Sequence, residues 1–324
     1  MHRQLEQELA DFYGSDACLT FVSGHATNVS TIGMLMGPGD LIVQDELMHN
    51  SAIVGAKLSG AKTVNFRHNN PDHLAEVLRE HRGTYKNALI VAEGLYSMDG
   101  DFPDLHRLVE IKKHFGCWLM LDEAHSLGVM GKTGRGSFEH FGLDPREVDI
   151  WMGTLSKTLG SCGGYICGNN ELIEILKYQA PGFVYSVGLS PPATAAALAS
   201  LRILKSDPER VAKVQANGQL FVEEAKKAGL DTMTSAGFSV VPVMIGDPVR
   251  AVRLADRLLE LGINALPIIH PAVPMKAARL RFFITSEHTP EQIRRTVQTV
   301  AEELVNVAKR QSLVERASLA VVVR

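Results

Sequence analysis

The feature that most constrains the fold is an alternation of short apolar runs with longer amphipathic stretches. Apolar runs occur at 41–43, 88–92, 118–121 and 150–152. Each is too short for a helix, shows no helical period, and is followed by glycine or polar side chains. Such runs are typical of buried parallel strands, and the stretches between them predict helices that cover the sheet. The polar residues after the strands then belong at the carboxyl edge of the sheet, where open α/β sheets bind ligands.

Composition excludes several classes of function. The net charge of −3 gives no reason to expect a nucleic-acid partner. No apolar run reaches the length of a membrane span, and no signal peptide opens the chain. No H-E-x-x-H motif or Cys/His cluster indicates a metal site. The four cysteines form no C-x-x-C pair, which predicts reduced thiols in a cytoplasmic protein.

One lysine lies in a setting unusual for a surface residue. The stretch DIWMGTLSKTLGSCGGYICG, residues 149–168, places Lys157 between two apparent strands, with small residues on both sides. An ordinary exposed lysine is the default interpretation. The alternative is a partly desolvated ammonium, because desolvation favours the neutral amine that attacks a carbonyl carbon as a Schiff-base nucleophile.

A second motif decides between these interpretations. The stretch CWLMLDEAHSLGVMGKTGRG, residues 117–136, contains an apparent buried strand that ends at Asp122. Alone, Asp122 could simply cap the following helix. Together with Lys157 it indicates pyridoxal phosphate, because the lysine would hold the aldehyde and the carboxylate would keep the ring nitrogen protonated.

The two motifs also carry a family resemblance. DEAHSLGVMGKTGRG followed by GTLSKTLGSCGGY resembles the α-oxoamine synthases, the group of fold-type I pyridoxal-phosphate enzymes that includes 8-amino-7-oxononanoate synthase and serine palmitoyltransferase. The resemblance covers nearly the whole chain. It implies an α/β fold with a large domain (1–204) built on a mostly parallel sheet wrapped by helices, and a small C-terminal α+β domain (205–324). Relatives carry several dozen residues before the first helix, so we expect that the N-terminal segment of the family is missing here.

The resemblance also implies a set of site residues. It places His49 on the face of the cofactor ring, His125 and Ser97 near its phenolic oxygen, and Arg279 on the amino-acid carboxylate. The cofactor-binding set is Gly24, His25, Ala26, His49, Glu93, Ser97, Asp122, His125, Thr154, Lys157 and Ser186. Ser186 is expected to reach the phosphate of the neighbouring subunit's cofactor. Without the resemblance, a lone histidine is more often a core or surface residue, and Glu93 could equally be a loop cap.

The expected activity is a decarboxylating condensation of an L-amino acid (serine, glycine or alanine) with an acyl thioester, in lipid or secondary-metabolite biosynthesis. The catalytic residues would be Lys157, His49, Asp122 and His125, in a homodimer with active sites at the subunit interface. The acyl donor could be acyl carrier protein or coenzyme A, and the stretches around 160–168 and 180–192 favour the carrier protein. Two alternatives stay open, namely a fold-type I aminotransferase and a non-catalytic partner subunit.

Overall fold

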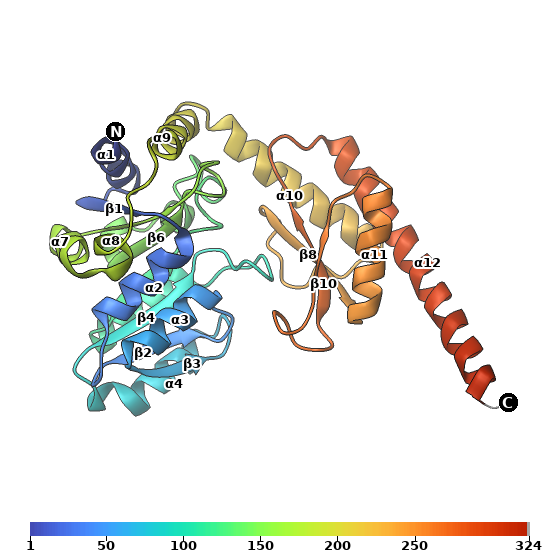
Figure 1. Ribbon diagram of the computed structural model, residues 1–324, viewed down its shortest axis with the longest axis horizontal. Coiled ribbons are helices and arrows are strands. Elements are labelled where there is room, and N and C mark those ends of the chain that lie inside the picture. Colours follow the sequence, from blue (N-terminus) through green and yellow to red (C-terminus); the bar gives the residue numbers. More distant parts are fainter. Residues whose placement is uncertain (323–324) are drawn as a thin grey trace. The chain divides into compact units, whose positions relative to one another are not determined.

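A computed structural model of the chain describes residues 1–322 (Figure 1). The chain divides into two compact units. The first contains Met1–Tyr96 and Phe102–Val211, and the second contains Ser97–Asp101 together with the chain from Ala212 onward. No sequence pattern predicts that the short segment Ser97–Asp101 belongs to the second unit. Within the described residues, no helix is both long enough and apolar enough to cross a membrane.

The first unit is built on a seven-stranded sheet. Its strands are β1 (Ala17–Phe21), β2 (Leu41–Asp45), β3 (Lys62–Phe66), β4 (Ala88–Glu93), β5 (Trp118–Asp122), β6 (Ile150–Thr154) and β7 (Gly164–Gly168). They lie in the order β1-β7-β6-β5-β4-β2-β3. β7 runs antiparallel to both of its neighbours, and the pairs from β6 to β3 are parallel. The predicted fold class, a mostly parallel sheet flanked by helices, is therefore confirmed.

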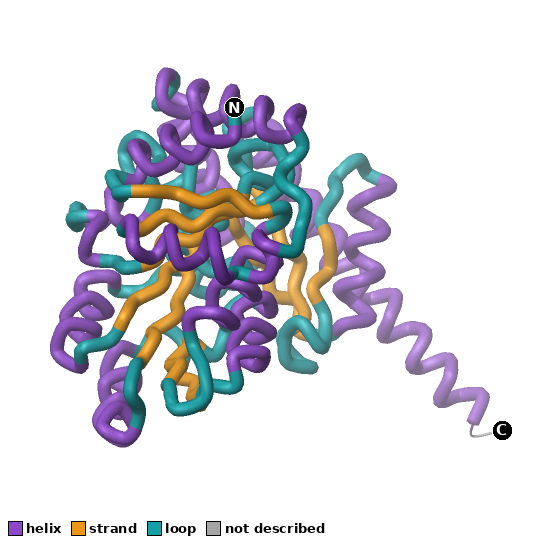
Figure 2. Tube along the Cα trace, turned by 60° about the vertical axis from the view of Figure 1, so that its left-hand side comes forward, coloured by secondary structure: helices purple, strands orange, loops and turns teal. Residues whose placement is uncertain are grey.

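Helices cover both faces of this sheet (Figure 2). They are α1 (His2–Tyr13), α2 (Gly24–Leu35), α3 (Asn50–Ser59), α4 (Pro71–His81), α5 (Leu105–Phe115), α6 (Ser137–Phe141), α7 (Asn170–Gln179), α8 (Pro181–Val184) and α9 (Pro191–Ser206). Val43 packs in the cluster that holds α1, α4, α5 and α9. Its neighbour Ile42 packs in the cluster that holds α2, α3 and α7. Both faces of each inner strand are thus buried, which explains the continuous apolar runs.

Local signals set the helix ends. α1 ends at Gly14, whose φ of 72° is in the left-handed region that glycine adopts most readily. α2 begins at Gly24. The reason is its N-cap, because the hydroxyl of Ser23 accepts a hydrogen bond from the N–H of Ala26 at 3.0 Å.

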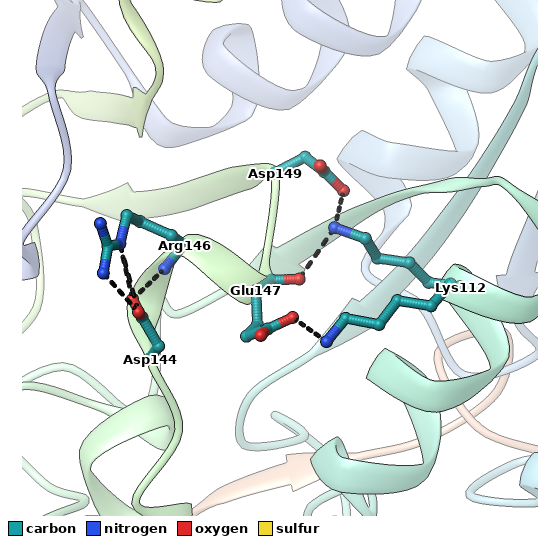
Figure 3. Close-up of polar contacts among 6 residues, drawn as sticks. Lys112, Asp144, Arg146, Glu147 and Asp149 are labelled. Carbon is teal, nitrogen blue, oxygen red and sulfur yellow. Dashed lines mark hydrogen bonds and ion pairs between the residues drawn. The ribbon is translucent and has the colours of Figure 1, made fainter.

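The entry into β6 is fixed by an ion-pair cluster (Figure 3). Lys112 Nζ donates to the Asp149 carboxylate at 2.7 Å and to the Glu147 carbonyl at 2.9 Å. The same Asp149 oxygen accepts from the N–H of Leu119 at the start of β5, at 2.7 Å. Lys113 adds an ion pair with Glu147 at 2.5 Å. These contacts hold β6 beside β5, so that the two strands end at the same edge of the sheet.

The second unit contains a three-stranded antiparallel sheet in the order β8 (Val240–Gly246), β10 (Ala278–Phe283), β9 (Leu266–Ile268). The helices α10 (Glu209–Lys227), α11 (Pro248–Glu260) and α12 (Pro290–Val322) accompany it. Its core gathers residues such as Phe221, Leu254 and Leu280. A capping box begins α12. Thr289 Oγ1 accepts from the N–H of Gln292 at 3.2 Å, and Gln292 Oε1 accepts from the N–H of Thr289 at 2.9 Å.

Candidate active site

The site is built at the carboxyl edge of the parallel strands. Glu93 and Asp122 end β4 and β5 and are register partners, with only 3% and 5% of each residue exposed. Asp122 is also paired with Met152 of β6, so Thr154 follows at the same edge. Two buried carboxylates and a hydroxyl therefore lie at the ends of three adjacent strands, where sequence reasoning expected functional groups.

A chain of hydrogen bonds leads from Asp122 to His49. Asn28 Nδ2, from the buried side of α2, donates to Asp122 Oδ2 at 2.8 Å and to Ser51 Oγ at 2.9 Å. Ser51 Oγ lies 2.7 Å from His49 Nδ1. The other carboxylate oxygen of Asp122 accepts from the N–H of Ala124 at 2.9 Å. One amide thus fixes the orientation of the predicted ring-nitrogen partner and, through Ser51, that of the predicted stacking histidine.

Sequence reasoning missed Asn28 and Ser51. The sequence contains only weak indications of their roles. Asn28 is a polar residue one turn after Gly24, where the helix faces the sheet, and Ser51 follows His49 by two residues. Neither position identifies a partner without the fold.

The backbone of His49 is fixed as well. His49 is the N-cap of α3, and its Nδ1 accepts from the N–H of Ser51 at 3.3 Å. The N–H of His49 donates to Glu93 Oε1 at 2.8 Å. Glu93 therefore anchors the segment that carries His49. The imidazole itself is exposed, so a ring could lie against it.

The start of α2 packs against the end of β6. A Cβ built on Gly24 would lie 3.0 Å from Thr154 Oγ1, and one built on Gly164 would lie 2.8 Å from the Cα of Gly24. Thr154 Oγ1 lies 2.8 Å from the hydroxyl of Ser156. Two hydroxyls thus gather beside a helix N-terminus, an arrangement that suits a phosphate. Of the predicted cofactor-binding residues in this first turn, Ala26 already gives its N–H to the Ser23 hydroxyl, while Gly24 and His25 begin the turn.

The structure corrects one expectation about Lys157. Lys157 is exposed in this chain, as are Ser156 and Thr158, in the turn between β6 and β7. The partial desolvation expected from the sequence is therefore not provided by the fold of this single chain. His125 is half-buried, three residues beyond Asp122, and Ser186 is exposed.

Arg279 and Ser97 belong to the second unit. Arg279 is buried and forms a close ion pair with Asp99, and its Nη1 also donates to the carbonyl of Met98 at 3.3 Å. The guanidinium thus already has a carboxylate partner, and its contact with an amino-acid carboxylate stays a prediction. Arg281, two residues along β10, is half-buried and donates to the carbonyl of Ser97 at 2.9 Å.

The residues of the first unit fit pyridoxal phosphate. Asp122 offers a buried carboxylate to a protonated ring nitrogen, and its two described hydrogen bonds come from neutral donors, Asn28 and the N–H of Ala124. Gly24, Thr154 and Ser156 offer a place for the phosphate, and Lys157 offers an accessible amine.

Comparison with known proteins agrees with this geometry. Residues 1–300 match the family Aminotransferase class I and II. The chain is 43% identical to an 8-amino-7-oxononanoate synthase of Symbiobacterium thermophilum, covering 90% of this chain and 74% of that protein. It is 35% identical to the long chain base biosynthesis protein 2d of Oryza sativa subsp. japonica, covering 93% of this chain and 65% of that protein.

A serine palmitoyltransferase from S. paucimobilis, solved with pyridoxal phosphate and myriocin bound, superposes with a TM-score of 0.89 at 30% identity. That match covers 95% of this chain and 77% of the other. The fold and the site define a pyridoxal-phosphate-dependent acyltransferase. The chain belongs to the aminotransferase class I and II family, within the group whose members join an amino acid to an acyl thioester with loss of carbon dioxide.

Proposed function

We propose that the first unit binds pyridoxal phosphate and catalyses the condensation through Lys157, Asp122, His49 and His125. The observation that carries this proposal is the hydrogen-bond chain from Asp122 through Asn28 and Ser51 to His49. When bound, the cofactor supplies a protonated ring that withdraws electrons from the α-carbon of the amino acid.

Each residue of the chain then has a defined task. Lys157 would hold the cofactor aldehyde, and its amine would take the α-proton of the amino acid. Asp122 keeps a negative charge opposite the ring nitrogen. His49 would lie against the ring face. His125 would donate a hydrogen bond to the phenolic oxygen, and Ser97 is predicted to lie near the same oxygen. Gly24, His25, Ala26 and Thr154 hold the phosphate.

The amino-acid carboxylate needs a guanidinium, because its planar fork offers two parallel hydrogen bonds. Arg279 is the residue predicted from the sequence, but its ion pair with Asp99 already satisfies it. Arg281 is a second candidate, favoured by its smaller degree of burial and its location on the same face of β10. A comparison of the two lysine variants, described in the Discussion, discriminates between them.

We infer a homodimer with Ser186 near the partner's cofactor. The support is the segment around Ser186, where Tyr185 and Val187 are 87% and 80% exposed. Large apolar side chains gathered on one surface segment are typical of a protein–protein interface. We also propose a cytoplasmic protein, supported by four free cysteines, of which Cys18, Cys117 and Cys167 are buried.

The acyl donor is proposed to be acyl carrier protein, on resemblance to the branch that uses it. A carrier protein presents an acidic helix and therefore depends on charge complementarity, which salt screens. The test compares kcat/KM for one acyl group on the carrier protein and on coenzyme A at low and raised salt. A strong preference for the coenzyme A thioester, insensitive to salt, would show that the carrier-protein assignment is wrong.

The activity itself is tested with purified protein against serine, glycine and alanine combined with a set of acyl thioesters. We expect thiol release that requires both substrates. Conversion of the cofactor to its amine form with amino acid alone, without thiol release, would indicate an aminotransferase. Cofactor binding with neither reaction would indicate a non-catalytic partner subunit.

A further inference from the structure

A second buried carboxyl lies directly after Asp122 and has no task in the proposed chemistry. Glu123 is 0% exposed. Its Oε2 accepts from the N–H of Ser137 at 2.9 Å, and its Oε1 is in close contact with the Ser137 hydroxyl, which donates to it. Ser137 begins α6 on the far side of a loop, so this carboxyl joins the end of β5 to the end of that loop.

The space around the carboxyl is matched to it. A Cβ built on Gly94 would lie 2.1 Å from Glu123 Oε1, and one built on Gly136 would lie 2.0 Å from Oε2. Gly136 also has a φ of 105°, which disfavours other residues. Gly94 follows Glu93, and its N–H donates to the carbonyl of Asp122 at 2.8 Å. The Glu123 carboxyl therefore fits between two glycines, one directly after β4 and the other directly before α6.

The backbone of Glu123 holds the turn that carries His125. Its N–H donates to the carbonyl of Met152 in β6 at 2.7 Å. Its carbonyl accepts from the N–H groups of Ser126 and Leu127, both at 3.1 Å. The side chain and the backbone of Glu123 thus both restrain the turn that carries His125.

We propose that Glu123 is a positioning residue, which holds Asp122 and His125 in place through Ser137 and the two flanking glycines. This inference rests on the proposed function, because it assigns Asp122 and His125 to the cofactor.

The same carboxyl can hold a proton. Burial, together with the charge of Asp122, raises the pKa of Glu123 to about 7, against the lowering effect of its bonds with Ser137. The other titratable groups that face it are the phenols of Tyr13 from α1 and Tyr165 from β7, whose pKa values burial raises well above the ordinary range. The protonated carboxyl can accept from the N–H of Ser137 and donate to its hydroxyl, and a glutamine can make the same two bonds.

The test uses Glu123→Gln and Glu123→Leu, with Glu139→Gln as the matched control. Glu139 lies in α6, two residues after Ser137, and accepts from the N–H groups of Thr133 and Arg135, both at 3.0 Å. The measurements are the affinity for pyridoxal phosphate and the absorbance of the bound cofactor from pH 6 to pH 8.5. The melting temperature of each variant reports whether it folds.

We expect Glu123→Gln to match the wild type at pH 6, where the native carboxyl is protonated, and to differ in both measurements above pH 7. Glu123→Leu should bind the cofactor about tenfold more weakly, since it leaves buried donors unpaired. Glu139→Gln should behave as the wild type. A Glu123→Leu variant that folds and matches the wild type in both measurements would overturn the proposal. If Glu123→Leu fails to fold, Ser137→Ala takes its place, because it removes the hydroxyl that contacts Oε1, and a match to the wild type in both measurements would likewise overturn the proposal. None of these measurements needs turnover. A chain that binds the cofactor but condenses no substrate would therefore refute the proposed function without refuting the role of Glu123.

Discussion

The two units each bury a charge at the end or edge of a sheet, and they stabilise it in different ways. In the first unit, the Asp122 carboxylate accepts hydrogen bonds from an amide and a backbone N–H, both neutral. In the second unit, Arg279 is paired with the carboxylate of Asp99. Dipoles keep the charge of Asp122 in place without cancelling it, whereas an ion pair cancels the charge of Arg279.

The way each charge is stabilised determines which of the two residues can recognise a charged ligand. Asp122 retains a negative charge that a cationic ring nitrogen would compensate. Arg279 would have to exchange its partner Asp99 for a substrate carboxylate, and breaking a buried ion pair is costly. The chemistry assigned to the first unit therefore agrees with its electrostatics, while the role predicted for Arg279 competes with a structural one.

The largest effect is expected at the accessible amine of the first unit. Lys157→Ala should reduce turnover by roughly 10³-fold or more, because no other group would take the α-proton from the same position. Borohydride reduction of the wild type should fix the cofactor on the peptide that contains Lys157. Lys177→Ala, which removes another exposed lysine, serves as the control. Label recovered on a different lysine would refute the assignment.

The next largest effect is expected at Asp122, whose carboxylate accepts hydrogen bonds from neutral donors. Asp122→Asn keeps the shape of the side chain and removes its charge, so we expect a loss of turnover of roughly 10²–10⁴-fold with an unchanged melting temperature. Asn28→Ala should give a smaller loss, since it removes one donor to Asp122 and the link to Ser51. Near-normal turnover of Asp122→Asn would show that the charge of Asp122 is not needed, and the contrast with Arg279 would have no functional meaning.

The third prediction concerns the pH dependence of stability. With its pKa at about 7 when folded, against 4.5 as the ordinary value, Glu123 binds a proton in the folded chain that the unfolded chain has released. The contribution of Glu123 to the free energy of unfolding should therefore decrease as pH rises from about 4.5 through 7, by about 3 kcal/mol in total. Thermal melting across this range should show a shallower decline for Glu123→Gln. Parallel pH profiles for the two proteins would contradict the raised pKa.

The smallest effect separates the two arginines of β10. Arg281→Lys should raise the KM for the amino acid about tenfold, because a point charge replaces a bidentate fork. Arg279→Lys should mainly lower the melting temperature, since the buried partner Asp99 loses its fitted guanidinium. Should Arg279→Lys raise the KM and leave stability unchanged, the original assignment to Arg279 would be correct and the contrast between the units would be weaker.

The class of fold and the kind of chemistry can be predicted from the sequence alone. Apolar runs such as 118–121 identify buried strands because a sheet covered on both faces leaves no polar alternation. Residues at strand ends identify the site, because parallel strands present their carboxyl ends at one edge. Lys157 and Asp122 could be selected for this reason, before any contact was known.

The hydrogen-bond and ion-pair partners of these residues follow from the tertiary structure and not from the sequence pattern. Asn28 and Asp122 are 94 residues apart, and their hydrogen bond depends on how α2 packs against the sheet. The pairing of Arg279 with Asp99 spans 180 residues and requires the segment Ser97–Asp101 to join the second unit. Local periodicity carries no information about such contacts. They follow from strand order and helix packing, which the whole chain sets together.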